Sequence, residues 1–285
     1  MELTALYLLL VFMGILVVKH FAFWQPMDVT YLYRNGYDKL GHRGSPKEAP
    51  ENTLPSYRKA LEQGLKAIEM DVLTTRDGKV VCSHNHDLEH ETDGTGYIDD
   101  MTYAELASVD AAAKFPDYSP CRLPLLEETL DAIPENVILD IEIKARGALD
   151  LTTAKHVVAL IRKRNIYHRV VVSSFHPLVI GRVKWLDRRI PTGYIWTDHS
   201  VPVILRKPRF INLVHPDVFK PEIHLVNEHL VRYARGKKLS ISPWTVNNQP
   251  AMEWSLNLGV QGIISDFPGL MHRAVENVKE FHEDR

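Results

Sequence analysis

Short apolar runs recur along the chain after residue 38, and polar or turn-forming residues bound each of them. Runs of this length are typical of buried strands. They predict strands at 39–42, 67–73, 80–84, 137–143, 170–175, 192–196, 210–214, 239–244 and 262–265. Segments with helical spacing separate most of these runs. This alternation indicates an α/β protein with a parallel sheet.

The part of the chain after the first 37 residues has the length of one (β/α)8 TIM barrel, about 250 residues, rather than of two domains. A barrel of this kind has eight strands, so one of the nine candidates must be an extension or a hairpin arm. Asp77-Gly78 is a good turn between the second and third candidates and favours a hairpin there. Asn52 or Thr53 can cap the helix that follows the first strand, and we expect this helix to end at Gly64.

The N-terminus carries a different pattern, because residues 3–18 form an uncharged and apolar run. Extending this run to Trp24 gives a helix of about 33 Å at 1.5 Å per residue, enough to cross a bilayer core of roughly 30 Å. A cleaved signal peptide is the alternative. The acidic Glu2 and the lack of a small-residue cleavage site favour an uncleaved anchor.

We therefore expect a transmembrane anchor at 1–24, a juxtamembrane linker at 25–37 and the barrel domain at 38–285. The fold prediction is a TIM barrel preceded by one transmembrane helix, in a single-pass membrane protein. Lys19, Arg34 and Lys39 follow the apolar run 3–18, while only the terminal amine is basic before it. This asymmetry favours a cytoplasmic position for the barrel.

Composition and charge limit the classes of partner that the protein can bind. The chain has 34 Lys and Arg against 36 Asp and Glu, a net charge of -2, so no overall positive field favours nucleic acid. Its two cysteines cannot form a disulfide framework. Cys82 lies in an apolar strand and is interpreted as a core thiol. The oligomeric state stays open.

Three carboxylates fall near predicted strand ends: Glu69, Asp71 and Glu142. Residues two apart in a strand point to the same face, so Glu69 and Asp71 project together. Three converging anions repel one another unless a cation lies among them. Oxygen ligands alone favour Mg²⁺ or Ca²⁺ over zinc, and the set predicts a divalent-cation site.

Two histidines, His42 and His84, close predicted strands near these carboxylates. Imidazole titrates near neutral pH, so one ring can take a proton from the attacking group while the other protonates the leaving oxygen. Arg43 offers a planar fork to a phosphate oxygen, and Lys144 offers a point charge. The residues together point to metal-assisted cleavage of a phosphodiester.

These residues occur in an ordered set of motifs that covers nearly everything after residue 38. They are His42-Arg43-Gly44, Glu51-Asn52-Thr53, Glu69-x-Asp71, Thr75-x-Asp77-Gly78, Val80-Val81-x-x-His84, Thr92-Asp93-Gly94-Thr95-Gly96, Glu142-x-Lys144, Ser173-Ser174-Phe175, Trp244-Thr245-Val246-Asn247 and Gly262-Ile263-Ile264-Ser265-Asp266-x-Pro268. The set resembles the glycerophosphodiester phosphodiesterases, including membrane-anchored members that share an N-terminal apolar segment. Some of those members act as lysophospholipases D.

The resemblance implies a phospholipase C-like TIM barrel that binds a divalent ion through Glu69, Asp71 and Glu142. His42 and His84 would be the general acid and base, with Arg43 and Lys144 on the phosphate. Glu51 would lie near the metal or the substrate hydroxyls, and Trp244 would pack against the glycerol. The expected products are sn-glycerol 3-phosphate, or lysophosphatidic acid, and an alcohol. Direct attack by water and attack through a cyclic phosphate both remain open.

The chain departs from the family pattern after the second histidine, where Asn85 stands in place of the usual aspartate. A His-Asp pair follows at His86-Asp87, but using it would require an insertion and a deletion. We therefore assign the catalytic role to His84. The tripeptide His84-Asn85-His86 also matches the name of the HNH nucleases, whose helix ligand the downstream sequence does not supply.

Two substrate classes are consistent with this sequence: soluble glycerophosphodiesters and lysophospholipids drawn from a bilayer. The apolar run at 201–205, followed by Arg206-Lys207, is either a membrane-facing loop or an ordinary amphipathic turn. A non-catalytic membrane protein that binds a phospho-ligand is the alternative from another class. Such a protein would be expected to have lost a carboxylate or a histidine, and the chain retains them all.

Overall fold

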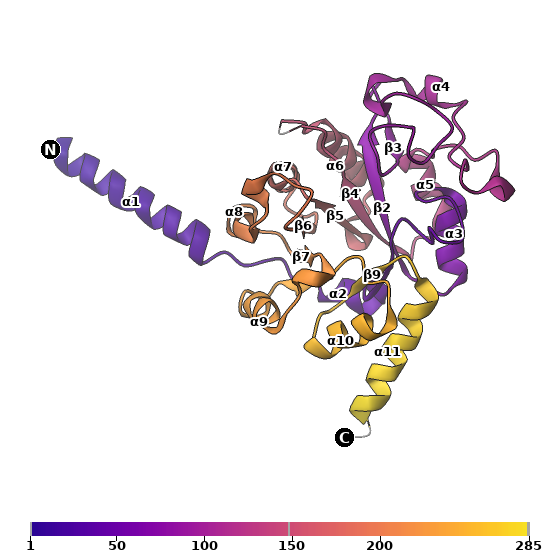
Figure 1. Cartoon of the computed structure of the whole chain (residues 1–285). Coiled ribbons are helices and arrows are strands. Elements are labelled where there is room, and N and C mark those ends of the chain that lie inside the picture. Colours follow the sequence, from indigo (N-terminus) through magenta and orange to yellow (C-terminus); the bar gives the residue numbers. More distant parts are fainter. Residues whose placement is uncertain (1, 148, 284–285) are drawn as a thin grey trace.

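A curled sheet of parallel strands forms the centre of the molecule (Figure 1). The computed structural model describes residues 2–147 and 149–283. The parallel strands are β1 (Lys39–Gly41), β2 (Ala67–Thr74), β4 (Ile138–Ile143), β5 (Val170–Ser174), β6 (Thr192–Trp196), β7 (Val218–Pro221), β8 (Ser240–Ile241) and β9 (Ile263–Ser265). They are ordered β8-β7-β6-β5-β4-β2-β1-β9.

The two ends of this order meet. The backbone N–H groups of Gln261 and Ile264 donate to the carbonyls of Ile241 and Pro243, 3.0 Å away in each case. The segment around β9 is thus joined to β8 and its extension, as expected for a TIM-like barrel. The ninth strand, β3 (Val80–Cys82), pairs antiparallel with β2, so the expected hairpin across Asp77-Gly78 is present.

Helices surround this sheet: α3 (Leu54–Glu62), α5 (Leu126–Ala132), α6 (Thr152–Arg164), α7 (Pro177–Leu186), α9 (Glu228–Gly236), α10 (Gln249–Leu258) and α11 (Pro268–Glu283). Apolar residues of β2, β4 and β5 pack against α5, α6 and α7 in one large core cluster. A second cluster joins β6, β7, β8 and β9 to α9, α10 and α11. Of the two candidate caps, Thr53 accepts the N–H of Ser56 and caps α3.

One strand prediction was wrong. The apolar run 210–214 forms the short helix α8 (Ile211–Val214), and the seventh parallel strand is β7 instead. A short apolar run does not by its pattern distinguish a buried strand from a helical turn. The sequence pattern does not indicate a strand at β7, because Lys220 and Pro221 follow directly after its two apolar residues, Val218 and Phe219.

The N-terminal run forms a helix, α1 (Glu2–Ala22), that projects from the barrel (Figure 1). No helix among the described residues has the length and hydropathy needed to cross a membrane. The expected transmembrane anchor is therefore not supported.

The residues that would lengthen such a span dock on the barrel domain instead. The carbonyl of Leu213 in α8 lies 3.2 Å from His20 Nε2. Trp24 is buried, stacks on His215 at 4.7 Å and donates its indole N–H to Asn212. Because His20 and Trp24 contact the barrel domain, the apolar segment that could extend the expected span is limited to the shorter run before Lys19.

The segment 25–37, expected to be a linker, is largely packed on the barrel. It forms α2 (Thr30–Leu32) and the π-helical η1 (Tyr33–Tyr37). Val29, Leu32 and Tyr37 are buried among residues at the beginnings of several strands. The segment therefore covers the amino-terminal end of the barrel, and the opposite end is left for the site.

Candidate active site

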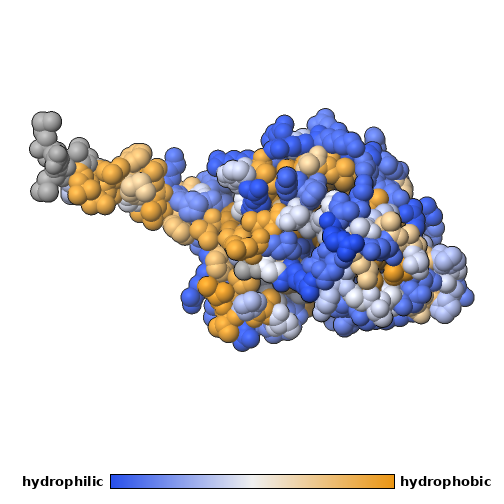
Figure 2. Space-filling view, turned by 90° about the horizontal axis from the view of Figure 1, so that it is seen from above, coloured by the Kyte–Doolittle hydropathy of each residue, from blue (hydrophilic) through white to orange (hydrophobic). Residues whose placement is uncertain are grey.

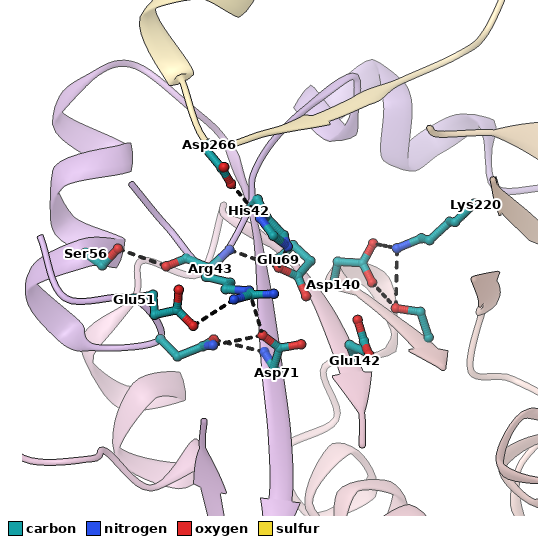
Figure 3. Close-up of polar contacts among 12 residues, drawn as sticks. His42, Arg43, Glu51, Ser56, Glu69, Asp71, Asp140, Glu142, Lys220 and Asp266 are labelled. Carbon is teal, nitrogen blue, oxygen red and sulfur yellow. Dashed lines mark hydrogen bonds and ion pairs between the residues drawn. The ribbon is translucent and has the colours of Figure 1, made fainter. Parts of the chain in front are cut away.

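Carboxylates from two neighbouring strands face the inside of the barrel near its carboxyl end (Figure 3). Glu69 and Asp71 of β2 lie opposite Asp140 and Glu142 of β4 in the parallel register. Glu69, Asp71 and Glu142 are buried, and each offers an oxygen within 4.8 Å of the other two. The structure thus brings together the three side chains that the sequence assigned to a metal.

The oxygens of this cluster fit a divalent cation. Glu69 Oε1 is buried and has no hydrogen-bond partner among the described residues. Lys144 Nζ lies 2.8 Å from Asp71 Oδ1 and 2.5 Å from Glu142 Oε1, and so supplies positive charge to the carboxylates in this structure. The all-oxygen donor set is the kind that Mg²⁺ and Ca²⁺ prefer.

Burial and mutual repulsion set the charges of the three acids. Burial, and then the charges of Asp71 and Glu142, raise the pKa of Glu69 well above its ordinary value. Burial likewise raises the pKa of Glu142 to about 7. Burial alone would also raise the pKa of Asp71, but Lys144 and Arg43 outweigh it and hold that pKa well below its usual range. Asp71 is therefore the firmly ionised member of the set.

The loop after β1 places Arg43 beside these acids. The Arg43 backbone N–H donates to Glu69 Oε2 at 2.9 Å, and Arg43 Nη1 donates to Glu51 Oε1 at 2.8 Å. Arg43 Nε lies 3.3 Å from Asp71 Oδ2. The arginine has a left-handed backbone with φ 53°, a conformation that suggests functional constraint in a non-glycine residue. Glu51 thus contacts the arginine directly.

His42 is held by a residue from the far end of the chain. Its Nδ1 lies 2.6 Å from Asp266 Oδ1, and its Nε2 lies 4.0 Å from Glu69 Oε2. Asn247 donates its side-chain N–H to Asp266 at 2.8 Å and so fixes the carboxylate. Burial lowers the pKa of His42, although the hydrogen bond with Asp266 opposes this shift.

His84 lines the same cavity, and its Nδ1 lies 3.0 Å from the side-chain oxygen of Asn85. Burial lowers the pKa of His84 to about 3, against the charge of Asp71. His86, the alternative in the sequence, lines a separate hollow with Asp99 and Asp150. The register chosen from the sequence therefore places the histidine in the cavity with the acids.

The cavity has a volume of about 150 Å³ and an aromatic wall. Trp244 and Phe175 meet edge to face at 5.2 Å, and the Trp244 indole N–H donates to the carbonyl of Lys220. Lys144 Nζ lies 5.8 Å from the centre of the Phe175 ring. A larger hollow of about 590 Å³ lies between the docked end of α1 and α7, away from the carboxylates. The histidines, carboxylates and cations that line the smaller cavity therefore identify it as the candidate active site.

Several residues of the site were not assigned from the sequence. Asn52 was noted as a possible helix cap and as part of the Glu51-Asn52-Thr53 motif, without a role of its own in the site. Its side chain donates to Asp71 Oδ2 at 2.8 Å and accepts the Asp71 backbone N–H. Asp266 and Asn247 belong to motifs noted in the sequence, but their contact with His42 comes only from barrel closure. Lys220 was missed together with its strand.

Comparisons with known proteins agree with this geometry. Residues 42–270 match the Glycerophosphoryl diester phosphodiesterase family. A glycerophosphodiester phosphodiesterase of Caldanaerobacter subterraneus subsp. tengcongensis is 30% identical over 234 residues, which cover 80% of this chain and 93% of the relative. A crystal structure of a putative glycerophosphoryl diester phosphodiesterase from Silicibacter pomeroyi has a TM-score of 0.75 at 27% identity, covering 85% of this chain and 93% of that chain.

A further structure similar to this chain, a phosphodiesterase from Oleispira antarctica, was solved in complex with the product sn-glycerol-3-phosphate. Its TM-score is 0.75 at 25% identity, with coverage of 86% of this chain and 99% of that chain.

Proposed function

The chain belongs to the glycerophosphoryl diester phosphodiesterase family, and from this premise we propose which of its own residues perform each step of the hydrolysis. The protein is a phosphoric diester hydrolase that converts glycerophosphodiesters to sn-glycerol 3-phosphate and an alcohol. The observation that carries the proposal is the convergence of His42, His84 and the three carboxylates on one cavity. A non-catalytic binding role does not account for this set.

Glu69, Asp71 and Glu142 would hold the divalent ion. When bound, the ion supplies Lewis-acid polarisation of a phosphoryl oxygen. Arg43 binds the phosphate through the guanidinium N–H groups that its contacts with Glu51 and Asp71 leave free, and Lys144 adds a positive charge to the same wall of the cavity. Glu51 orients Arg43 through their 2.8 Å contact.

His42 and His84 have different partners, and we assign their roles accordingly. Asp266 is a carboxylate, so it stabilises an imidazolium at His42 after His42 Nε2 has accepted a proton. Asn85 orients the ring of His84 but carries no charge to stabilise its protonated form. We therefore assign the proton transfer to His42, whose Nε2 takes the proton of the attacking group and returns it to the leaving alcohol oxygen. His84, in its neutral form, orients the reacting groups by hydrogen bonding.

Trp244 and Phe175 form an apolar wall against which the carbon backbone of glycerol can pack. The cavity is small, which suits a glycerophosphate group and leaves the alcohol portion toward the mouth. A polar wall and an apolar wall facing each other would orient the phosphate over the carboxylates.

A second substrate class, lysophospholipids, is favoured by apolar side chains outside the cavity. Val203 and Ile204 are 75% and 67% exposed in the loop after β6, which leaves the carboxyl end of the sheet. Apolar residues are also exposed along α1, as the arm in Figure 2 shows. These surfaces suit contact with a lipid aggregate. The position of the barrel relative to a membrane stays a prediction.

The test is choline release from glycerophosphocholine and from lysophosphatidylcholine in detergent, with Mg²⁺, with Ca²⁺ and with EDTA. Metal-dependent release from the soluble diester is the expected result. Release from the lipid alone would make the enzyme a lysophospholipase D. Release that EDTA leaves unchanged would contradict the metal assignment, and no release from either substrate would redirect the search to other head groups.

A further inference from the structure

Two histidines and two carboxylates gather at the carboxyl ends of β6 and β7, outside the cavity described above. Asp198 Oδ1 lies 3.0 Å from His224 Nε2 and 3.5 Å from His199 Nδ1. Glu222 Oε2 lies 3.4 Å from His199 Nδ1, and Glu222 Oε1 lies 3.6 Å from His224 Nδ1. One ligand atom each from Asp198, His199 and His224 fits within 4.8 Å of the others.

The two carboxylates of this cluster are paired with histidines alone. Within the described part of the chain, the ion-pair partners of Asp198 and Glu222 are His199 and His224, and no lysine or arginine is among them. A divalent cation at this position would supply positive charge to both carboxylates.

An outer hydrogen bond orients one of the carboxylates. The buried Thr197 donates its hydroxyl to Glu222 Oε2 at 2.5 Å, and the same hydroxyl oxygen lies 3.0 Å from His199 Nδ1. Glu222 is also fixed by its backbone, because its N–H donates to the carbonyl of Trp196 at 2.9 Å. Such support from outside the ligand set is typical of metal sites.

We propose that Asp198, His199 and His224, with Glu222 beside them, form a second metal site that takes a first-row divalent transition metal such as Zn²⁺. Imidazole nitrogen with carboxylate oxygen is a donor set that zinc accepts, whereas the oxygen-only site of the cavity suits harder ions. The two sites would therefore select different metals. The proposal does not depend on the phosphodiesterase activity.

The position of the cluster gives this metal a structural consequence. Asp198 and His199 open the loop that carries Val203 and Ile204, while His224 lies in the 3-10 turn η7 (Ile223–Leu225) after β7. Glu222 forms a β-bridge with Trp244, which lines the cavity. A metal at the cluster would tie the loop after β6 to the strand end beside Trp244, and so order the rim of the cavity.

The experiment measures Zn²⁺ uptake by the full chain after removal of metals, in excess Mg²⁺ that occupies the oxygen-only site. Wild type should take up one equivalent more than the double variant His199→Ala/His224→Ala. His229→Ala removes an exposed histidine of α9 and is the matched control, so it should bind as wild type does. Near-ultraviolet circular dichroism confirms that each variant is folded.

Two further measurements separate this site from adventitious binding. Thr197→Val keeps the shape of the side chain and should weaken Zn²⁺ binding about 10- to 100-fold, the usual effect of an outer-shell change. Hydrogen exchange of residues 198–206 should slow when Zn²⁺ is added to wild type, and not in the double variant. Equal uptake by wild type and the double variant, or no uptake by wild type, would overturn the proposal.

Discussion

His42 Nδ1 and Asp266 Oδ1 lie 2.6 Å apart, although 224 residues separate them in the chain. His42 follows β1 and Asp266 follows β9, two strands that pair in the barrel. The pair directs the other ring nitrogen, Nε2, toward Glu69 and the cavity. Asp266 is thus a positioning residue for the histidine to which we assign proton transfer.

We expect Asp266→Asn to lower kcat by roughly 10²-fold, the lower end of what a positioned acid–base group contributes, with little change in KM. The hydrogen bond with Asp266 raises the pKa of His42, so its loss should shift the limb of the pH–rate profile that reports His42 to lower pH. The measurement is kcat against pH for both proteins. An unchanged profile with reduced kcat would assign Asp266 a structural role only.

The two histidines flanking Asn85 give a matched pair of variants. His84→Ala should abolish most turnover, a loss of at least about 10²-fold, because His84 lines the cavity. His86→Ala should keep most of the activity, since His86 lines a different hollow and its backbone carbonyl, which the substitution retains, bonds to Ile98. Steady-state assays with glycerophosphocholine compare them. The reverse result would move the catalytic register to His86-Asp87.

The hydrophobic pattern predicted the eight-stranded class of the fold, because the strands recur with helices between them. It failed at β7, where Lys220 and Pro221 break the apolar run. It failed also at α8, where a run that could pair instead forms a short helix beneath Trp24. Both errors concern segments of about four residues, a length at which tertiary packing decides the structure.

The candidate site was predictable where neighbours in sequence share a strand, as Glu69 and Asp71 do. Contacts that depend on closure of the barrel were not. The Asp266 partner of His42 and the pairing of Lys220 with Asp140 join distant segments, and no local period relates them. The docking of His20 and Trp24 on α8 is of the same kind, and it changes the interpretation of the N-terminal run.

Removing one metal ligand should change the metal concentration that activity requires while the fold is kept. We expect Glu69→Ala to raise the Mg²⁺ or Ca²⁺ concentration needed for half-maximal activity, because Glu69 Oε1 is buried without a hydrogen-bond partner among the described residues. Glu135→Ala, at an exposed position outside the site, is the control. A metal titration of activity makes the comparison. An unchanged midpoint for Glu69→Ala would remove this residue from the ligand set.

Metal binding should tighten as the pH rises through about 7. Burial raises the pKa of Glu142 to about 7, so at lower pH a proton competes with the metal for this carboxylate. Below that pH, affinity should fall by up to about tenfold per unit, as expected when one proton must leave. Calorimetric titrations at several pH values measure the slope. A flat profile across this range would show that Glu142 binds the metal without losing a proton.

The same shift predicts how the metal-free protein responds to pH. The native Glu142 binds a proton between its unfolded pKa of 4.5 and about 7, whereas the unfolded chain does not. Its contribution to the free energy of unfolding therefore decreases as the pH rises through this window. The difference between wild type and Glu142→Gln in denaturant unfolding isolates this contribution. A difference that grows in favour of wild type with rising pH would contradict the sign.

The deepest charged pair of the barrel gives a test of stability. Lys220 contacts Asp140, and Tyr37 OH and Ser173 Oγ each donate to the same carboxylate at 2.5 Å. All four side chains are buried. Because the pair is fully removed from water, the loss of one member should lower the free energy of unfolding much more than it would in an exposed pair.

We therefore expect Lys220→Met to lower the free energy of unfolding by about 3–5 kcal/mol, since it leaves the Asp140 carboxylate buried with neutral donors only. The double variant Asp140→Asn/Lys220→Met should recover most of this loss, because the amide that replaces the carboxylate would retain an oxygen for Tyr37 or Ser173 without a buried charge. Equilibrium unfolding in urea of wild type, both single variants and the double variant completes the cycle. Losses that simply add would show that Asp140 and Lys220 are energetically independent, and the buried contact would then not account for the stability of the barrel interior.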